Sequence, residues 1–125
     1  MKVGERARVT RVFSQADQTD YARISGHAVT DNSVSEPLIG ALFSFLLGVK
    51  LPGRGAMYLK QETSYQHSAV IGESLIAEVE ITGLRPDKKL VDLSTICRRA
   101  DGSLVASGRA LVYMGDADLW TDEHG

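Results

Sequence analysis

Cysteine is almost absent from this sequence, and charge of one sign is not in excess. Cys97 is the single cysteine among 125 residues, so no internal disulfide can form. The 14 basic and 16 acidic side chains are interleaved and give a formal net charge of -2. They form no basic stripe that would neutralise a phosphate backbone, so we expect no nucleic-acid partner.

Long apolar runs are also missing. The longest apolar stretch extends from Pro37 to Val49 and is broken by Gly40, Ser44 and Gly48. It is shorter than the ~20 residues that a membrane span needs. We therefore expect a buried helix at this place and no membrane partner.

Targeting signals and metal-ligand spacings are absent too. Met1 leads directly into the charged stretch from Lys2 to Arg8, without an apolar signal segment, which favours a cytoplasmic protein. The three histidines and the cysteine show none of the spacings of a metal site. We expect no bound metal.

What the chain does contain is enough apolar residues for one core. Hydrophobic residues make up 43% of it, which suffices for one domain of this length and leaves no room for a second. We expect residues 1–115 to form that domain and residues 116–125 to form a C-terminal tail.

Two helices are predicted. Ser14 can cap a first helix that extends to Ser25, with Asp17 three positions after the cap and Gly26 as the stop. The polar stretch from Gly26 to Ser35 is then a loop. Pro37 is placed like the first residue of a second helix, and Leu38 to Val49 is apolar around its whole circumference, which predicts a central helix covered on every side.

Strand periodicity occupies most of the remaining chain. Alternation of polar and apolar residues predicts strands at Glu5 to Phe13, Met57 to His67, Ser74 to Leu84, Leu90 to Arg99 and Leu104 to Met114. Asp101-Gly102 is a strong hairpin signal between the last two strands. Four consecutive strands after an apolar helix predict an α+β fold, a meander whose concave face holds the helix. A second subunit is expected to complete the cover of that helix.

Several stretches resemble one known family in their order and spacing. They are Phe13-Ser14-Gln15-Ala16-Asp17, Tyr21-Ala22-Arg23-Ile24-Ser25-Gly26, Leu42-Phe43-Ser44-Phe45-Leu46-Leu47-Gly48, Leu51-Pro52-Gly53, Tyr58-Leu59-Lys60-Gln61, Ile71-Gly72-Glu73 and Leu84-Arg85-Pro86-Asp87-Lys88-Lys89. Together they resemble the MaoC-like, (R)-specific enoyl-CoA hydratase family, over nearly the whole chain from Val3 to Met114.

The resemblance implies a hotdog fold, an antiparallel sheet wrapped around one long apolar helix. It also implies an acyl-CoA or acyl-carrier thioester as the substrate, with no cofactor besides the coenzyme A of that substrate. A homodimer is the implied assembly, with a hetero-oligomer as the alternative.

The sequence departs from the family at the catalytic loop. In the family an aspartate follows the Ser-Gly pair, and an Asn-Pro-x-His sequence comes a few residues later. Here Gly26 is followed by His27, no Asn-Pro-x-His occurs, and Ser35-Glu36 replaces the family's His-Gly pair before the helix. The resemblance therefore implies a catalytic pair that is altered in this chain.

Four residues are candidates for catalysis: His27, Asp31, Asn32 and Glu36. Imidazole can act as a base near neutral pH, and Asp31 or Asn32 could orient it, although both are ordinary turn residues and His27 could be a plain loop histidine. Glu36 precedes the buried helix, where its carboxylate could act beside the helix N–H groups or simply stabilise the helix start.

Substrate contacts are expected from Leu38 and Gly40 in the central helix and from Arg54, Tyr58 and Lys60 after it. Arg54 and Lys60 could bind the phosphates of coenzyme A at a subunit boundary, or be solvated surface charges.

Three functions stay open at this point. The first is an acyl-CoA hydratase or dehydratase in which His27 and its neighbours replace the family's pair. The second is a hotdog thioesterase in which Glu36 activates water. The third is a non-catalytic subunit that binds acyl thioesters.

Overall fold

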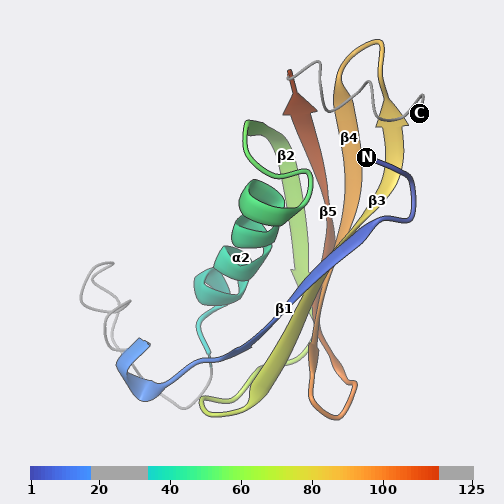
Figure 1. Ribbon diagram of the computed structural model, residues 1–125. Helices are drawn as coiled ribbons and strands as arrows, with labels where there is room; N and C mark the ends of the chain where they lie inside the picture. The colour runs from blue at the N-terminus through green and yellow to red at the C-terminus, as the bar shows by residue number, and fades with distance from the viewer. Residues whose placement is uncertain (18–33, 116–125) are drawn as a thin grey trace.

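The computed structural model describes residues 1–17 and 34–115. In this part of the chain one five-stranded antiparallel sheet curls around a single helix (Figure 1). The elements are β1 (Arg6–Val12), α2 (Glu36–Phe45), a π-helical turn (Leu46–Lys50), β2 (Ala56–Tyr65), β3 (Ser74–Arg85), β4 (Leu90–Arg99) and β5 (Leu104–Met114). The α+β class and the antiparallel sheet around an apolar helix are confirmed.

The two central strands show why the sequence folds this way. On β3, Ala77, Val79 and Ile81 are fully buried on the helix side, and on β4 Val91 and Leu93 are buried beside them. The residues between them point to the open face of the sheet, because successive side chains of a strand alternate. The alternation that predicts these two strands is confirmed.

The order of the strands corrects one expectation. The sheet has the order β1-β3-β4-β5-β2, so only β3, β4 and β5 form a meander. β2 pairs with β5 at the far edge, because residues 66–73 cross the sheet and β1 occupies the place beside β3. The predicted meander of four strands was therefore wrong by one strand.

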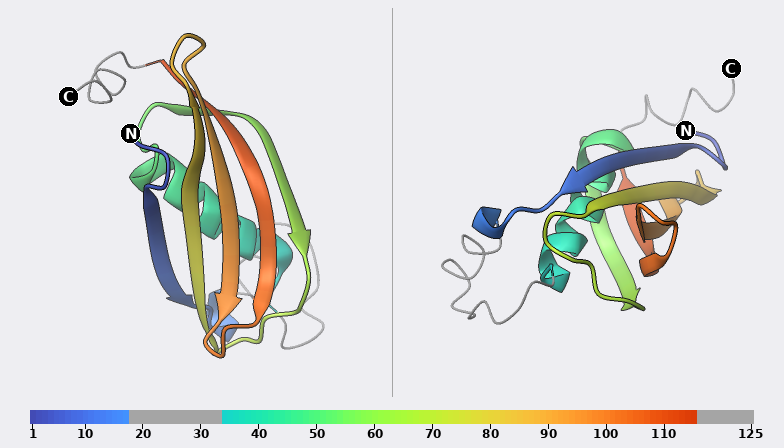
Figure 2. Two further views of the ribbon diagram at one scale, coloured as in Figure 1. Left: turned by 90° about the vertical axis from the view of Figure 1, so that its right-hand side faces the viewer. Right: turned by 90° about the horizontal axis from the view of Figure 1, so that it is seen from below.

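The central helix is shorter and less enclosed than the sequence predicts. α2 begins at Glu36, one residue before Pro37, and after ten residues it continues for five residues as a π-helical turn. One side, with Ile39, Phe43 and Leu46, is buried against the sheet. The opposite side is exposed at Ala41, Ser44, Phe45 and Val49, because the sheet of one chain covers only one side of the helix (Figure 2).

Local signals at one helix start and one hairpin turn are confirmed. The Ser14 hydroxyl accepts a hydrogen bond from the Asp17 N–H at 3.1 Å, and an Asp17 carboxylate oxygen accepts one from the Ser14 N–H at 2.8 Å, which is a reciprocal cap. Asp101 and Gly102 form the turn between β4 and β5, and an Asp101 carboxylate oxygen accepts a hydrogen bond from the Ser103 N–H. The rest of the predicted first helix, most of the loop to Ser35, and the tail 116–125 lie outside the described residues.

No helix in the described ranges is long and apolar enough to cross a membrane.

Candidate active site at the start of helix α2

Among the described residues, the first turn of α2 leaves one backbone N–H without an acceptor. Ser35 precedes the helix, and its carbonyl accepts hydrogen bonds from the N–H groups of Leu38 (3.0 Å) and Ile39 (3.3 Å). Pro37 has no N–H. The N–H of Glu36 has no acceptor among the residues that the structure describes. A thioester oxygen bound here would meet this N–H at the positive end of the helix.

Glu36 also brings a carboxylate to this end of the helix. It is the first residue of α2, its side chain is exposed, and it is the acidic residue of the first turn. A negative charge at this position is favourable with respect to the helix dipole whether or not it acts in catalysis. Its placement fits both roles that the sequence leaves open.

Tyr65 lies next to this turn, and sequence reasoning missed it. Its hydroxyl donates a hydrogen bond to the backbone carbonyl of Glu36 at 3.2 Å. Burial raises the pKa of Tyr65, and the charges of Glu36 and Cys97 raise it further, so the hydroxyl stays protonated and remains a donor. A tyrosine near a strand end is ordinary β-sheet composition, which is why the sequence did not single it out.

Two predicted substrate contacts, Leu38 and Gly40, take part in the packing of the helix, and their contact with substrate stays a prediction. Gly40 lies under Tyr65, whose hydroxyl oxygen is 3.6 Å from the place where a Cβ would stand. Leu38 is half-buried and packs against the core.

Tyr58 makes the same type of contact near the other end of the helix. Its hydroxyl donates a hydrogen bond to the Ser44 carbonyl at 2.7 Å, and burial raises the pKa of Tyr58. The predicted contact of Tyr58 with substrate stays untested.

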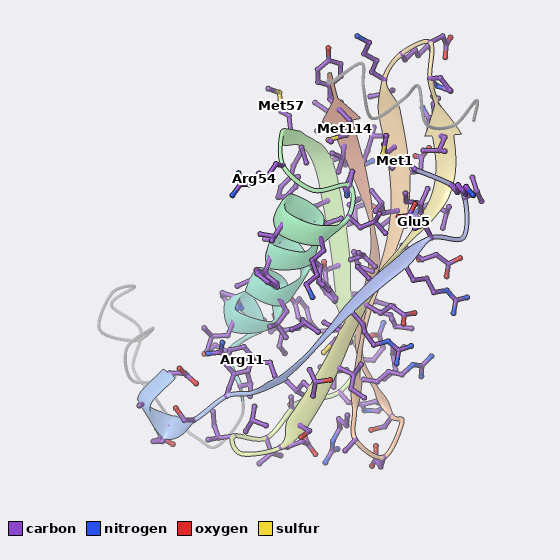
Figure 3. The ribbon with its side chains drawn as sticks, viewed as in Figure 1. Met1, Glu5, Arg11, Arg54, Met57 and Met114 are labelled. Atoms are coloured by element: carbon purple, nitrogen blue, oxygen red, sulfur yellow. The ribbon has the colours of Figure 1, made fainter. Side chains whose placement is uncertain are left out.

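The two predicted phosphate ligands lie away from the start of α2 within one chain. Arg54 lies in the turn that follows the helix, at the end opposite to Glu36 (Figure 3). Lys60 pairs with Glu62 at 3.0 Å and lines the open face of the sheet with it. The structure therefore does not bring Arg54 and Lys60 to Glu36 in the same subunit.

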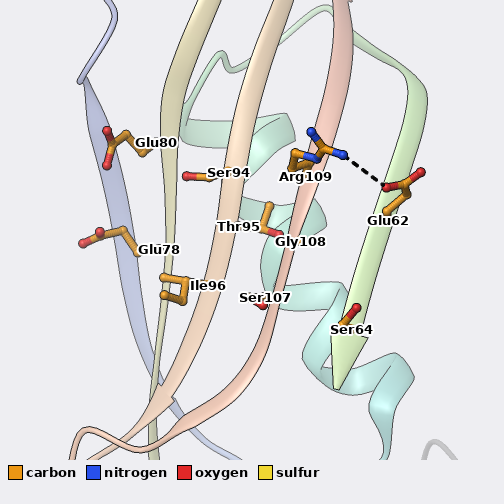
Figure 4. Close-up of a pocket in the computed structure, with 10 residues that line it drawn as sticks. All are labelled: Glu62, Ser64, Glu78, Glu80, Ser94, Thr95, Ile96, Ser107, Gly108 and Arg109. Carbon is orange, nitrogen blue, oxygen red and sulfur yellow. Dashed lines mark ion pairs between the residues drawn. The ribbon is translucent and has the colours of Figure 1, made fainter. Parts of the chain in front are cut away.

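The open face of the sheet carries a shallow hollow of about 440 Å³ (Figure 4). Its lining is mostly polar and includes Glu62, Glu78, Ser94, Ser107 and Arg109. The hollow lies on the side of the sheet that faces away from α2, so it is separate from the helix start.

The other three predicted catalytic residues, His27, Asp31 and Asn32, lie outside the described residues. Within the described part of the chain, no group of three or more His, Cys, Asp or Glu side chains could hold a metal ion.

An antiparallel sheet in this strand order, curled around a central helix, defines the class of hotdog-fold proteins. Similarity to solved structures supports the same fold. The (R)-hydratase from Aeromonas caviae involved in PHA biosynthesis matches with a TM-score of 0.87 and 33% identity, over 91% of this chain and 97% of that chain.

Curated relatives are enzymes of acyl-thioester metabolism by name. The (R)-specific enoyl-CoA hydratase of Aeromonas caviae is 33% identical over 91% of this chain and 96% of its own length. A mitochondrial 3-hydroxyacyl-acyl-carrier-protein dehydratase of Solanum lycopersicum is 29% identical over 91% of this chain and 78% of its own length. No protein-family model matches the sequence. The chain belongs to the (R)-specific enoyl-CoA hydratase family.

Proposed function

We propose that this chain is an acyl-thioester hydratase or dehydratase that works with an altered catalytic pair. The observation that carries the proposal is the similarity to an (R)-specific enoyl-CoA hydratase over 96% of that relative's length. The reaction adds water across the double bond of an enoyl thioester, or removes it in the reverse direction. It needs a base for the water, an acid for the carbon, and a donor for the thioester oxygen.

The start of α2 supplies the donor in this proposal. The Glu36 N–H has no described acceptor and lies where the helix dipole favours negative charge, so it would stabilise the charge that develops on the thioester oxygen. His27, oriented by Asp31 or Asn32, would transfer the proton, with the Glu36 carboxylate as the second titratable group of the site.

The altered pair has a consequence for the rate. Proton transfer by a positioned group contributes typically ~10²–10⁴-fold to turnover. Because His27 and Asn32 occupy the places expected for the family's aspartate and histidine, we expect slower hydration of ordinary enoyl-CoA substrates than in an enzyme that keeps the family's pair.

A homodimer is part of the proposal, since one flank of the molecule is apolar and exposed. Val49 is 58% exposed and Phe45 43% exposed on the helix, while Met57 and Leu59 on β2 are 59% and 53% exposed. β2 is also an edge strand of the sheet. Pairing of β2 with the same strand of a second copy would cover this flank and remove the open edge.

Such a pairing would bring a cation to each site from the other subunit. Two β2 strands related by a two-fold axis are antiparallel, so the Arg54 end of one subunit lies beside the Tyr65 end of its partner. The Tyr65 hydroxyl donates a hydrogen bond to the Glu36 carbonyl, so this end of β2 lies at the helix start. Arg54 of one subunit would then lie near the helix start of the other, where it could bind a phosphate of the substrate's coenzyme A.

A thioesterase is the second candidate, because Glu36 places an exposed carboxylate beside the helix N–H group. In that reaction Glu36 would activate water to attack the thioester carbonyl and release free thiol.

Incubation with crotonyl-CoA tests these alternatives together. Loss of the conjugated double bond without free thiol supports the hydratase, and free thiol supports the thioesterase. Binding without either product would show a non-catalytic subunit, and an absence of binding and turnover with both CoA and acyl-carrier thioesters would overturn the proposed function.

A further inference from the structure

Two tyrosines of edge strand β2 contact the central helix in the same way. Tyr65 donates a hydrogen bond to the carbonyl of Glu36, and Tyr58 donates one to the carbonyl of Ser44. The two acceptors are two helical turns apart, so one tyrosine holds the first turn of α2 and the other holds its C-terminal end.

A glycine makes room for each hydroxyl. Gly40 follows Glu36 by four residues, and Gly48 follows Ser44 by four. In a helix the carbonyl of residue i points toward residue i+4, so a side chain at i+4 stands beside that oxygen. A Cβ would be 3.6 Å from the Tyr65 hydroxyl at Gly40 and 3.4 Å from the Tyr58 hydroxyl at Gly48. Bulkier side chains would push either hydroxyl away from its carbonyl.

The two contacts differ in which part of the helix they fix in place. The Tyr58 contact joins parts of the molecule that carry none of the candidate catalytic groups. The Tyr65 contact fixes the carbonyl of Glu36, the residue whose N–H and carboxylate both lie at the helix start. We propose that Tyr65 is a positioning residue, which holds the first turn of α2 so that the Glu36 N–H and carboxylate keep the geometry needed for the thioester. This inference rests on the proposed function, because it concerns the same site.

The matched pair of variants Tyr65→Phe and Tyr58→Phe tests the proposal. Each removes one hydroxyl and one hydrogen bond to a helix carbonyl, so both should lower the melting temperature by similar amounts. We expect Tyr65→Phe to lower kcat for crotonyl-CoA hydration by roughly 10- to 100-fold with KM within about twofold, since small displacements of reacting groups have effects of this size. Because Tyr58 is itself an expected substrate contact, Tyr58→Phe should raise KM more than it lowers kcat. An equal loss of kcat in the two variants would overturn the proposal.

A rescue separates the hydrogen bond from the phenol itself. In the double variant Tyr65→Phe with Gly40→Ser, the introduced serine hydroxyl can donate to the carbonyl four residues before it, which is that of Glu36. We expect kcat to recover to within about fivefold of the wild-type value. If the first turn is held again but kcat does not recover, the Tyr65 hydroxyl acts on the substrate and a positioning role is wrong.

Amide hydrogen exchange tests whether Tyr65 holds the first turn of α2, and this measurement does not depend on enzymatic activity. Leu38 and Ile39 donate to the Ser35 carbonyl in the first turn of α2. Their amides should exchange faster by about fivefold in Tyr65→Phe, should be unchanged in Tyr58→Phe, and should be protected again in the double variant. Unchanged exchange in Tyr65→Phe would overturn the proposal even if the wild-type protein proved inactive, whereas inactivity alone would overturn only the proposed function.

Discussion

At the residue scale, Cys97 is a reactive type of side chain that the fold makes unreactive by burying it. It is fully buried on the helix side of β4. Burial raises the pKa of the thiol to about 11. The thiolate is the reactive form of cysteine, so Cys97 is inert in the folded protein near neutral pH.

The raised pKa of Cys97 predicts a loss of stability at alkaline pH. The unfolded thiol ionises near its ordinary pKa of 9.0, whereas the folded thiol ionises at about 11. The stabilising effect is therefore complete below about pH 9 and is lost as the pH rises toward about 11, and it amounts to about 3 kcal/mol at most. Urea unfolding at about pH 8 and about pH 10 should show this decrease, and the Cys97→Ala variant should show less of it. The same decrease in both proteins would contradict the assignment.

At the scale of elements, the sequence predicts most strands, because alternating side chains and turn residues are signals that lie within or next to each strand. The bounds of β4 and β5 follow from alternating side chains and from the Asp101-Gly102 turn. The place of β2 at the far edge is a long-range property, since it depends on residues 66–73 crossing the sheet. No periodicity within β2 encodes which strand will lie beside it.

The candidate site was predictable only in part. Glu36 was singled out because an acidic residue before an apolar helix is a local pattern, and the structure places it at the first position of α2. Tyr65 was not, because it acts on a backbone carbonyl 29 residues earlier in the chain. The spacing of Gly40 and Gly48 was visible in the sequence, but the tyrosines that face them become evident only when the sheet is formed.

The contact between α2 and β2 predicts opposite effects of two substitutions at Gly40. Alanine adds a Cβ at 3.6 Å from the Tyr65 hydroxyl, which is ordinary contact, and removes the cost of glycine in a helix. Gly40→Ala should therefore raise the free energy of unfolding by up to about 1 kcal/mol. Gly40→Leu should lower it by about 1–3 kcal/mol, because the longer side chain displaces Tyr65. Urea denaturation measures both, and an unchanged stability of Gly40→Leu would show that the contact is not close.

At the scale of the whole molecule, the two faces of the sheet have different chemistry. The open face has cross-strand ion pairs, such as Arg6 with Glu80 at 2.9 Å and Arg8 with Glu78 at 3.1 Å. The side that carries α2 and the edge of β2 exposes Phe45, Val49 and Leu59. This asymmetry favours association through the helix side and leaves the charged face to solvent.

If the dimer is joined at β2, each site should contain residues from both subunits. If Glu36 of one chain works with Arg54 of the other, Glu36→Gln and Arg54→Ala homodimers each have two damaged sites. A mixed dimer has one site with both changes and one site with neither. When the two variants are unfolded together and refolded at equal amounts, half of the dimers should be mixed, so the activity should recover to about a quarter of the wild-type value. Refolding each variant alone is the control and should give no recovery. If Glu36 and Arg54 of the same chain served one site, every site in the mixed dimer would carry a change, and mixing would restore nothing.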